Sequence, residues 1–172
     1  MKDIYVKFDG ASELQGDSTD AKHANEIEVS SFRHLLSQPK SSSASSAGGH
    51  TAERTEHGEI LLIKDIDKST PKLNRACSAG TVYPKVYLTF YRAYGGSGAT
   101  STSQTRVDYY KMVLENVVVS SSETVVADGE LPTQSFGLKY GKVTWEYKQH
   151  KMDGSSTSTG VAGWDLRTNV AV

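Results

Sequence analysis

Apolar and polar residues alternate with a period of two through most of this chain, and this alternation constrains its fold more than any other feature. Successive side chains of a β-strand point to opposite faces of a sheet, so a period of two indicates strands with one buried face. The alternation is clear in IYVKF (4–8), EIEV (26–29) and PKVYLTFYR (84–92). A denser apolar run at 58–66 indicates a strand covered on both faces. A long β-branched segment at 106–120 precedes a short predicted strand at Thr124 to Ala127.

The last clear strand, residues 134–149, changes the parity of its apolar side chains halfway along. They occupy first Phe136, Leu138 and Tyr140, and then Val143, Trp145 and Tyr147. We predict a β-bulge at Gly141, because an extra residue would keep one face buried and glycine tolerates unusual backbone angles. About seven or eight strands separated by turn signals predict a mainly β domain, either a sandwich or a compact barrel. A chain of 172 residues fits one such domain, 1–172.

The segment from Asp65 to Gly80 is the exception and predicts one short helix. Its structural residues are Thr70 as the N-cap, Pro71 at the first helical position, Leu73, Ala76 and Cys77 as a narrow apolar stripe, and Gly80 as the stop. We expect the stripe to pack against the edge of a sheet or the opening of a barrel.

Three segments rich in Ser, Gly and Thr interrupt the strands, at 37–50, 93–104 and 153–163. They are too polar to be buried and unsuited to a helix, so we expect surface loops there.

Charge and composition exclude several classes of function. The formal net charge is −1, from 19 basic and 20 acidic residues, and no basic run indicates a surface for nucleic acid. Cys77 is the single cysteine, which excludes an intramolecular disulfide and a thiolate metal site. Its position late in the helix, on the apolar stripe, favours a small buried hydrophobe over a nucleophile. The five histidines lack metal-binding spacing, so we expect no catalytic site, no metal and no cofactor.

The segment MKDIYVKFDG carries no signal-peptide apolar block, and no apolar run approaches the length that spans a bilayer. We therefore expect a protein that is made in the cytoplasm and, if exported, leaves without a cleaved signal and without membrane insertion.

Tyrosines alternate with the predicted core positions, which places several of them on sheet faces away from the barrel interior. They are Tyr87, Tyr91, Tyr109, Tyr110 and Tyr147. Tyrosine suits protein interfaces because it offers apolar area together with a hydroxyl group. Many strands, no catalytic site and faces rich in tyrosine together favour an assembly protein.

Four segments resemble a known family. DKSTPKLNRACSAGTVYPKVYLTF (67–90) resembles the signature of the type VI secretion tube protein, the hemolysin-coregulated protein family (Hcp). KHANEIEVSSF (22–32), the pair VDYYKMVLENVVVSS and FGLKYGKVTWEYKQ, and AGWDLRTNVAV (162–172) fit the same family in the same order. The resemblance runs nearly from end to end.

The resemblance implies two β-sheets that form a tight barrel with one helix on its side. It also implies a homo-hexameric ring that stacks into a secreted tube. The implied partners are other copies of the chain, a contractile sheath, a spike protein, and small effectors that the lumen carries and chaperones.

The family's long loop corresponds here to about 37–54, and the C-terminal tail to about 153–172. Candidate residues for ring stacking are Ser41, Ser42, Ser43, Ser45, Ser46, Gly48, Gly49 and His50. Arg33, Tyr87, Tyr91, Tyr109 and Tyr110 are candidates for the subunit interface or the lumen. The alternative from another class is a monomeric β-sandwich that presents its Ser/Gly-rich loops to a ligand.

Overall fold

The structure is a computed structural model that describes residues 3–39, 54–93, 106–126, 128–129, 131–151 and 156–172. The first six strands are β1 (Ile4–Phe8), β2 (Ile27–Val29), β3 (Ser31–Arg33), β4 (Leu36–Ser37), β5 (Glu56–His57) and β6 (Ile60–Asp65). Helix α1 (Thr70–Ala79) follows them. The later strands are β7 (Val82–Ala93), β8 (Arg106–Val125), β9 (Thr133–Lys139), β10 (Lys142–His150), β11 (Ser156–Asp165) and β12 (Val170–Ala171).

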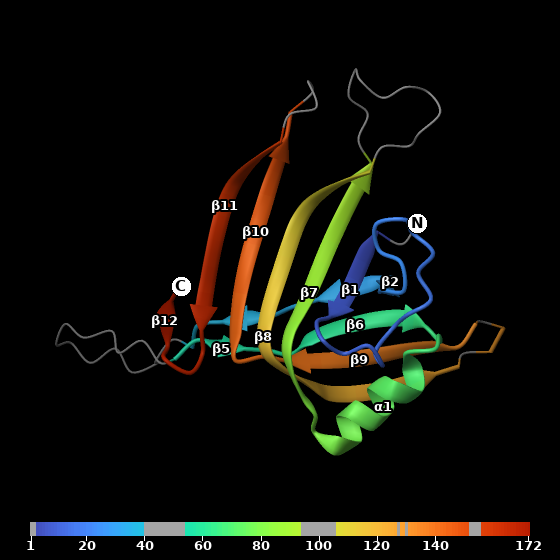
Figure 1. The fold of residues 1–172 in the computed structure, drawn as a ribbon. Coiled ribbons are helices and arrows are strands. Elements are labelled where there is room, and N and C mark those ends of the chain that lie inside the picture. Colours follow the sequence, from blue (N-terminus) through green and yellow to red (C-terminus); the bar gives the residue numbers. More distant parts are fainter. Residues whose placement is uncertain (1–2, 40–53, 94–105, 127, 130, 152–155) are drawn as a thin grey trace.

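The strands form a closed barrel with an upright extension. Ten of them make one antiparallel sheet in the order β12-β11-β10-β8-β7-β1-β2, and β8 also pairs with β9, β9 with β6, and β6 with β3. The segment 27–33 pairs first with β1 and then with β6, and so closes the sheet on itself. The long strands β7, β8, β10 and β11 rise above the barrel, while β6, β9 and α1 lie at its base (Figure 1). Strands β4 and β5 make a separate two-stranded sheet.

The barrel interior holds the apolar residues that the alternation predicts. Val6, Leu62, Leu88, Leu114 and Leu138 come from five different strands and are completely buried. The mainly β barrel with one short helix packed on it is therefore confirmed.

Helix α1 packs on β8 through Leu73 and Ala76, which are buried, while Cys77 is half-buried against the core. Gly80 ends the helix in the left-handed conformation, with φ of 61°, as predicted. The predicted N-cap is wrong: the cap is Ser69, and Pro71 is the second helical residue. The Thr70 hydroxyl is engaged elsewhere, since it accepts a hydrogen bond from the Lys64 ammonium group at 2.9 Å.

The parity change near Gly141 is real, but the predicted bulge is wrong. Val118 pairs with Lys139 and Glu115 with Lys142, three residues apart on both strands, so neither strand has an extra residue there. Strand β8 changes its buried face at the same level, from Met112 and Leu114 to Val117 and Val119. The two strands bend together, and Asn116 of β8 adopts a φ of 54° at the bend. The register shift between β8 and β9 lies instead at Ser120.

Two other expectations are corrected. The short strand predicted after residue 120 is the end of β8, which continues to Val125. The segment 153–163, expected as a loop, contributes most of β11, which pairs along the whole of β10. Serine and threonine fit a strand once a neighbouring strand offers hydrogen bonds.

Candidate assembly surface

The part of the sheet formed by β7, β8, β10 and β11 is called the upright sheet here. The four interface or lumen candidates on it, Tyr87 and Tyr91 of β7 and Tyr109 and Tyr110 of β8, are all partly buried. Tyr87 borders a hollow of about 250 Å³. Tyr109 lies under the guanidinium group of Arg92, at 5.4 Å from the ring centre. Tyr110 packs on Phe90 with ring centres 5.2 Å apart, and burial raises its pKa. Tyr109 and Tyr110 thus have partners within the subunit, and Tyr87 borders a hollow.

Arg106, the first residue of β8, links the upright sheet to β1 and to the loop after it. Its guanidinium group donates a hydrogen bond to the Tyr5 hydroxyl at 2.9 Å and pairs with the Asp20 carboxylate. His23 stacks on Tyr5 at 4.4 Å, and its Nε2 lies 2.7 Å from the hydroxyl oxygen of Tyr91. The fourth candidate tyrosine therefore belongs to an internal network that fixes the loop against the sheet.

A second cluster joins β5, the segment between β3 and β4, and the bend between β9 and β10. His34 Nε2 and His57 Nδ1 each lie 2.8 Å from the hydroxyl oxygen of Tyr140. The ring centre of His57 is 6.4 Å from that of Trp145. Burial lowers the pKa of both histidines and raises that of Tyr140. The cluster fastens the base of the β4–β5 sheet to the barrel.

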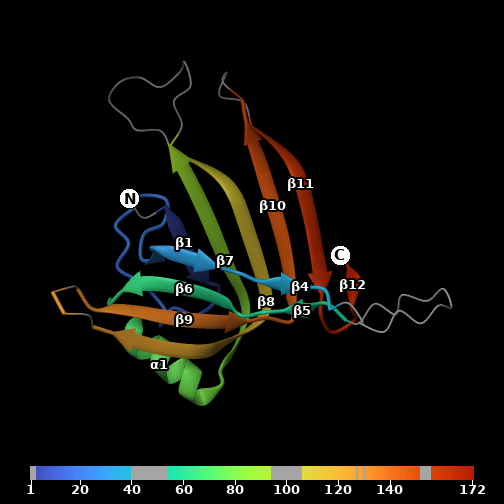
Figure 2. The same ribbon diagram turned by 180° about the vertical axis from the view of Figure 1, so that it is seen from behind.

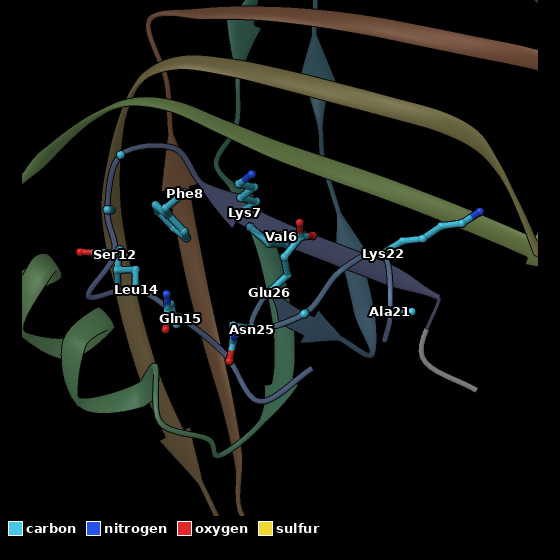
Figure 3. Close-up of a pocket in the computed structure, with 13 residues that line it drawn as sticks. Val6, Lys7, Phe8, Ser12, Leu14, Gln15, Ala21, Lys22, Asn25 and Glu26 are labelled. Carbon is cyan, nitrogen blue, oxygen red and sulfur yellow. The ribbon is translucent and has the colours of Figure 1, made fainter. Parts of the chain in front are cut away.

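A hollow of about 470 Å³ lies between β1 and the loop that follows it (Figure 3). Phe8 and Leu14 supply apolar lining, and Lys7, Lys22 and Glu26 supply charges at its border. This lining contains no nucleophile paired with a base. Across the described residues, no group of three or more His, Cys, Asp or Glu side chains is placed to hold a metal ion.

The remaining candidates are separated in space or fall outside the described residues. Arg33 is exposed at the end of β3. The stacking candidates Ser41, Ser42, Ser43, Ser45, Ser46, Gly48, Gly49 and His50 lie outside the described residues. In the part of the chain that the structure describes, no helix is long and apolar enough to cross a membrane.

The outer edge of the upright sheet is formed by β11. Strand β11 pairs with β10 on one side, but the C-terminal segment covers the other side only at Gly163, Trp164 and Asp165. Val161, in the uncovered part, is 66% exposed. An open edge presents unpaired backbone N–H and C=O groups, which favour pairing with another strand.

Comparison with known proteins agrees with this architecture. Residues 5–147 match the family model described as "Type VI secretion system effector, Hcp". The protein hcp1 of Pseudomonas aeruginosa is 34% identical over 170 residues, which cover 98% of this chain and 97% of that protein. The chain belongs to the Hcp family of the type VI secretion system.

Solved structures share the fold of this Hcp-family chain. A structure described as a type six secretion system protein superposes with a TM-score of 0.84 at 26% identity, and both chains are covered completely. Hcp1 from Salmonella typhimurium superposes with a TM-score of 0.70 over 99% of this chain and 98% of that one, at 23% identity. The family assignment predicted from the four segments is therefore confirmed.

Residues that the sequence reasoning did not select dominate the polar clusters of this Hcp-family chain. They are Arg106, His23, His34, His57 and Tyr140. The partners of both Tyr140 bonds are 83 or more positions away in the sequence, so no local motif reveals them.

Proposed function

We propose that this chain forms homo-hexameric rings that stack into the inner tube of a type VI secretion system. The role is mechanical and templating. Each subunit joins the next by a head-to-tail contact, and such contacts close into a ring when the rotation between subunits allows it. A contractile sheath expels the tube behind a spike protein, and the lumen carries small effectors. The chain is made in the cytoplasm and is then secreted.

The observation that carries this proposal is the open outer edge of β11. Native proteins rarely leave a long strand edge uncovered, because such edges invite uncontrolled pairing. A neighbouring subunit in a ring covers this edge and removes the hazard. Val161, Val170 and Val172, all more than half exposed near the edge, would then be covered as well.

We further propose that the loop at about 37–54 contacts the next ring. Strands β4 and β5 flank residues 40–53 and lie as a ribbon beside the lower ends of β10 and β11, away from α1 (Figure 2). Arg33, at the root of that ribbon, is an exposed candidate for the lumen or the ring interface.

A proline at Val161 tests the edge of β11. The backbone N–H of Val172 donates to the Gly163 carbonyl oxygen at 3.1 Å, so the Gly163 backbone faces away from β10. Alternate residues of a strand point their N–H groups to the same side, so the N–H of Val161 also faces outward. Val161→Pro removes that donor and leaves the pairing with β10 in place.

We expect Val161→Pro to stay folded by circular dichroism and to elute as a monomer in size-exclusion chromatography with light scattering. Val161→Thr keeps the N–H and serves as the matched control, which should form rings like the unchanged chain. A folded Val161→Pro protein that forms normal rings would exclude this edge from the interface.

A further inference from the structure

The β4–β5 sheet is a ribbon attached to the barrel at one narrow joint. Strand β3 pairs with β6 through Arg33 and Leu61, and β4 pairs with β5 through Leu36 and His57. The register differs by one residue between these two pairings. Between them, one backbone hydrogen bond runs from the Gly58 N–H to the carbonyl oxygen of Leu35, at 2.9 Å.

The joint is therefore a break in an otherwise continuous hairpin, and such a break permits bending. Strands β4 and β5 pair only with each other among the described strands. Leu35 and Leu36 are 58% and 43% exposed, so the ribbon buries little apolar surface of its own. Its attachment depends on the side chains at the joint.

Those side chains are His34 and His57, and both meet the same group. In the sequence, His34 directly follows β3, where the break begins, and His57 is the last residue of β5, directly before the break on the returning side. Each has one ring nitrogen 2.8 Å from the Tyr140 hydroxyl oxygen. Tyr140 is 8% exposed and lies at the bend between β9 and β10, which belongs to the barrel. The hydroxyl is thus the common anchor for both strands of the ribbon.

The number of hydrogen-bond donors and acceptors in this cluster makes the anchor sensitive to acid. With both histidines neutral, one imidazole N–H donates to the Tyr140 oxygen and the Tyr140 O–H donates to the other imidazole. If both histidines are protonated, each has only N–H groups to offer, and the Tyr140 proton has no acceptor among the three groups. Two positive rings would also face each other with centres 6.5 Å apart.

The surroundings do not compensate for such a charge. Burial and the neighbouring His57 lower the pKa of His34 from its ordinary value of 6.5, and burial lowers that of His57. The barrel side contributes Tyr140, whose pKa burial raises, and Tyr110 of β8, whose pKa is raised in the same way. Both tyrosines are therefore neutral at pH 7 and below.

The charged residues beside the histidines in the sequence point elsewhere. Arg33 and Glu56 are exposed. The Glu59 carboxylate accepts hydrogen bonds from the hydroxyl groups of Ser120 and Ser121. Trp145 and Phe32, the other side chains against the two rings, carry no charge.

We propose that His34, His57 and Tyr140 form an acid-released latch, which holds the β4–β5 ribbon on the barrel at neutral pH and frees it when the histidines are protonated. A group whose pKa is lower in the closed state favours that state above its ordinary pKa and loses the effect as the pH falls. Release therefore begins near pH 6.5 and increases in more acidic solution. Any effect of release on stacking rests on the proposed tube function, but the release itself does not.

Hydrogen exchange on the full chain measures the latch directly. Amide protection in residues 33–38 and 55–59 is compared at pH 7.5 and pH 5.5, after correction for the intrinsic exchange rate. One pH unit below the ordinary pKa, each buried neutral histidine lowers the closed-to-open ratio by up to about tenfold. With two histidines, we expect a loss of up to about a hundredfold in the ribbon, with protection in β7 unchanged.

Glutamine variants separate the latch from general acid sensitivity. The double variant His34→Gln with His57→Gln should lose the pH dependence, and the single variant His57→Gln should lose about half of it on a logarithmic scale. His150→Gln, at a histidine outside the cluster, should keep it. Unchanged ribbon protection at pH 5.5 in the natural chain, or an undiminished response in the glutamine variants, would overturn the proposal.

The same samples distinguish the latch from the tube. If the chain is monomeric but protection of its ribbon depends on pH, the latch is supported and the proposed ring is contradicted. If the chain forms rings but protection of the ribbon does not depend on pH, the proposed function is supported and the latch is contradicted.

Discussion

Lys64 occupies an inward position of β6 and is completely buried, although a charged group is costly to remove from water. Its ammonium group pairs with the Asp67 carboxylate at 2.6 Å and donates to the Thr70 hydroxyl and to the Asp65 carbonyl oxygen. Burial lowers the pKa of Lys64, and the hydrogen bond to Asp67 opposes that shift. The buried amine thereby fixes the start of α1 against the barrel.

Removing this amine should destabilise the fold. Lys64→Ala leaves the Asp67 carboxylate without its cation, and loss of one partner of a buried ion pair costs about 3 kcal/mol or more. Urea unfolding measures the free energy. Lys68→Ala is the matched control, because the Lys68–Asp17 pair is exposed and 3.7 Å long, and we expect it to cost less than about 1 kcal/mol. Equal effects of the two substitutions would contradict the structural role given to Lys64.

The individual residues of the polar clusters could not be predicted from the sequence. Lys64 lies in a dense apolar run, and nothing in that run shows which side of the strand is buried. Its partner Asp67 is only three positions away in the sequence, but the run does not show that the two side chains meet in the interior. The Arg106 and Tyr140 clusters join segments more than 80 positions apart. Such contacts depend on how the barrel closes, which local patterns do not determine.

At the scale of elements, the bend shared by β8 and β10 shows what periodicity can and cannot reveal. The parity change in residues 134–149 correctly marks a break, but the sequence does not show that β8 bends beside it. The strain of the bend is carried by Asn116, whose positive φ is uncommon for residues other than glycine. Asparagine tolerates this region better than most residues do.

Substitutions at Asn116 test this account of the bend. Asn116→Val places a β-branched residue at a positive φ and should cost about 1–2 kcal/mol of unfolding free energy. Asn116→Gly should be close to neutral, because glycine adopts this conformation without steric cost. Thermal and urea unfolding measure the stability of the two variants. A Val variant as stable as the Gly variant would show that the bend does not depend on this residue.

Strands rich in apolar or β-branched residues were predicted well, and strands that are polar or very short were missed. Strands β1, β6 and β7 follow directly from their apolar pattern, and the stop of α1 follows from Gly80. Strand β11 consists largely of small and polar residues and exists because β10 offers it a complete ladder of partners. Strands β4 and β5 are two residues each, too short to produce a pattern.

For the whole molecule, the family and the barrel were accessible from the sequence, and the edge of β11 that we propose as the subunit contact was not. Tyr91 contacts His23 and Tyr110 contacts Phe90 within the subunit, and the place of the candidate tyrosines at the subunit interface or the lumen stays a prediction. The open edge of β11 became visible only once the strand order was known. That edge is the basis of our proposal that the folded chain completes its sheet with another copy.

The mass of the assembly in solution tests this claim most directly. Sedimentation or light scattering of the natural chain at micromolar concentration should give six chains of 18.7 kDa, about 112 kDa in total, and negative-stain images should show rings. A single species of 18.7 kDa, with no rings in the images, would contradict the account and favour a monomeric binding module.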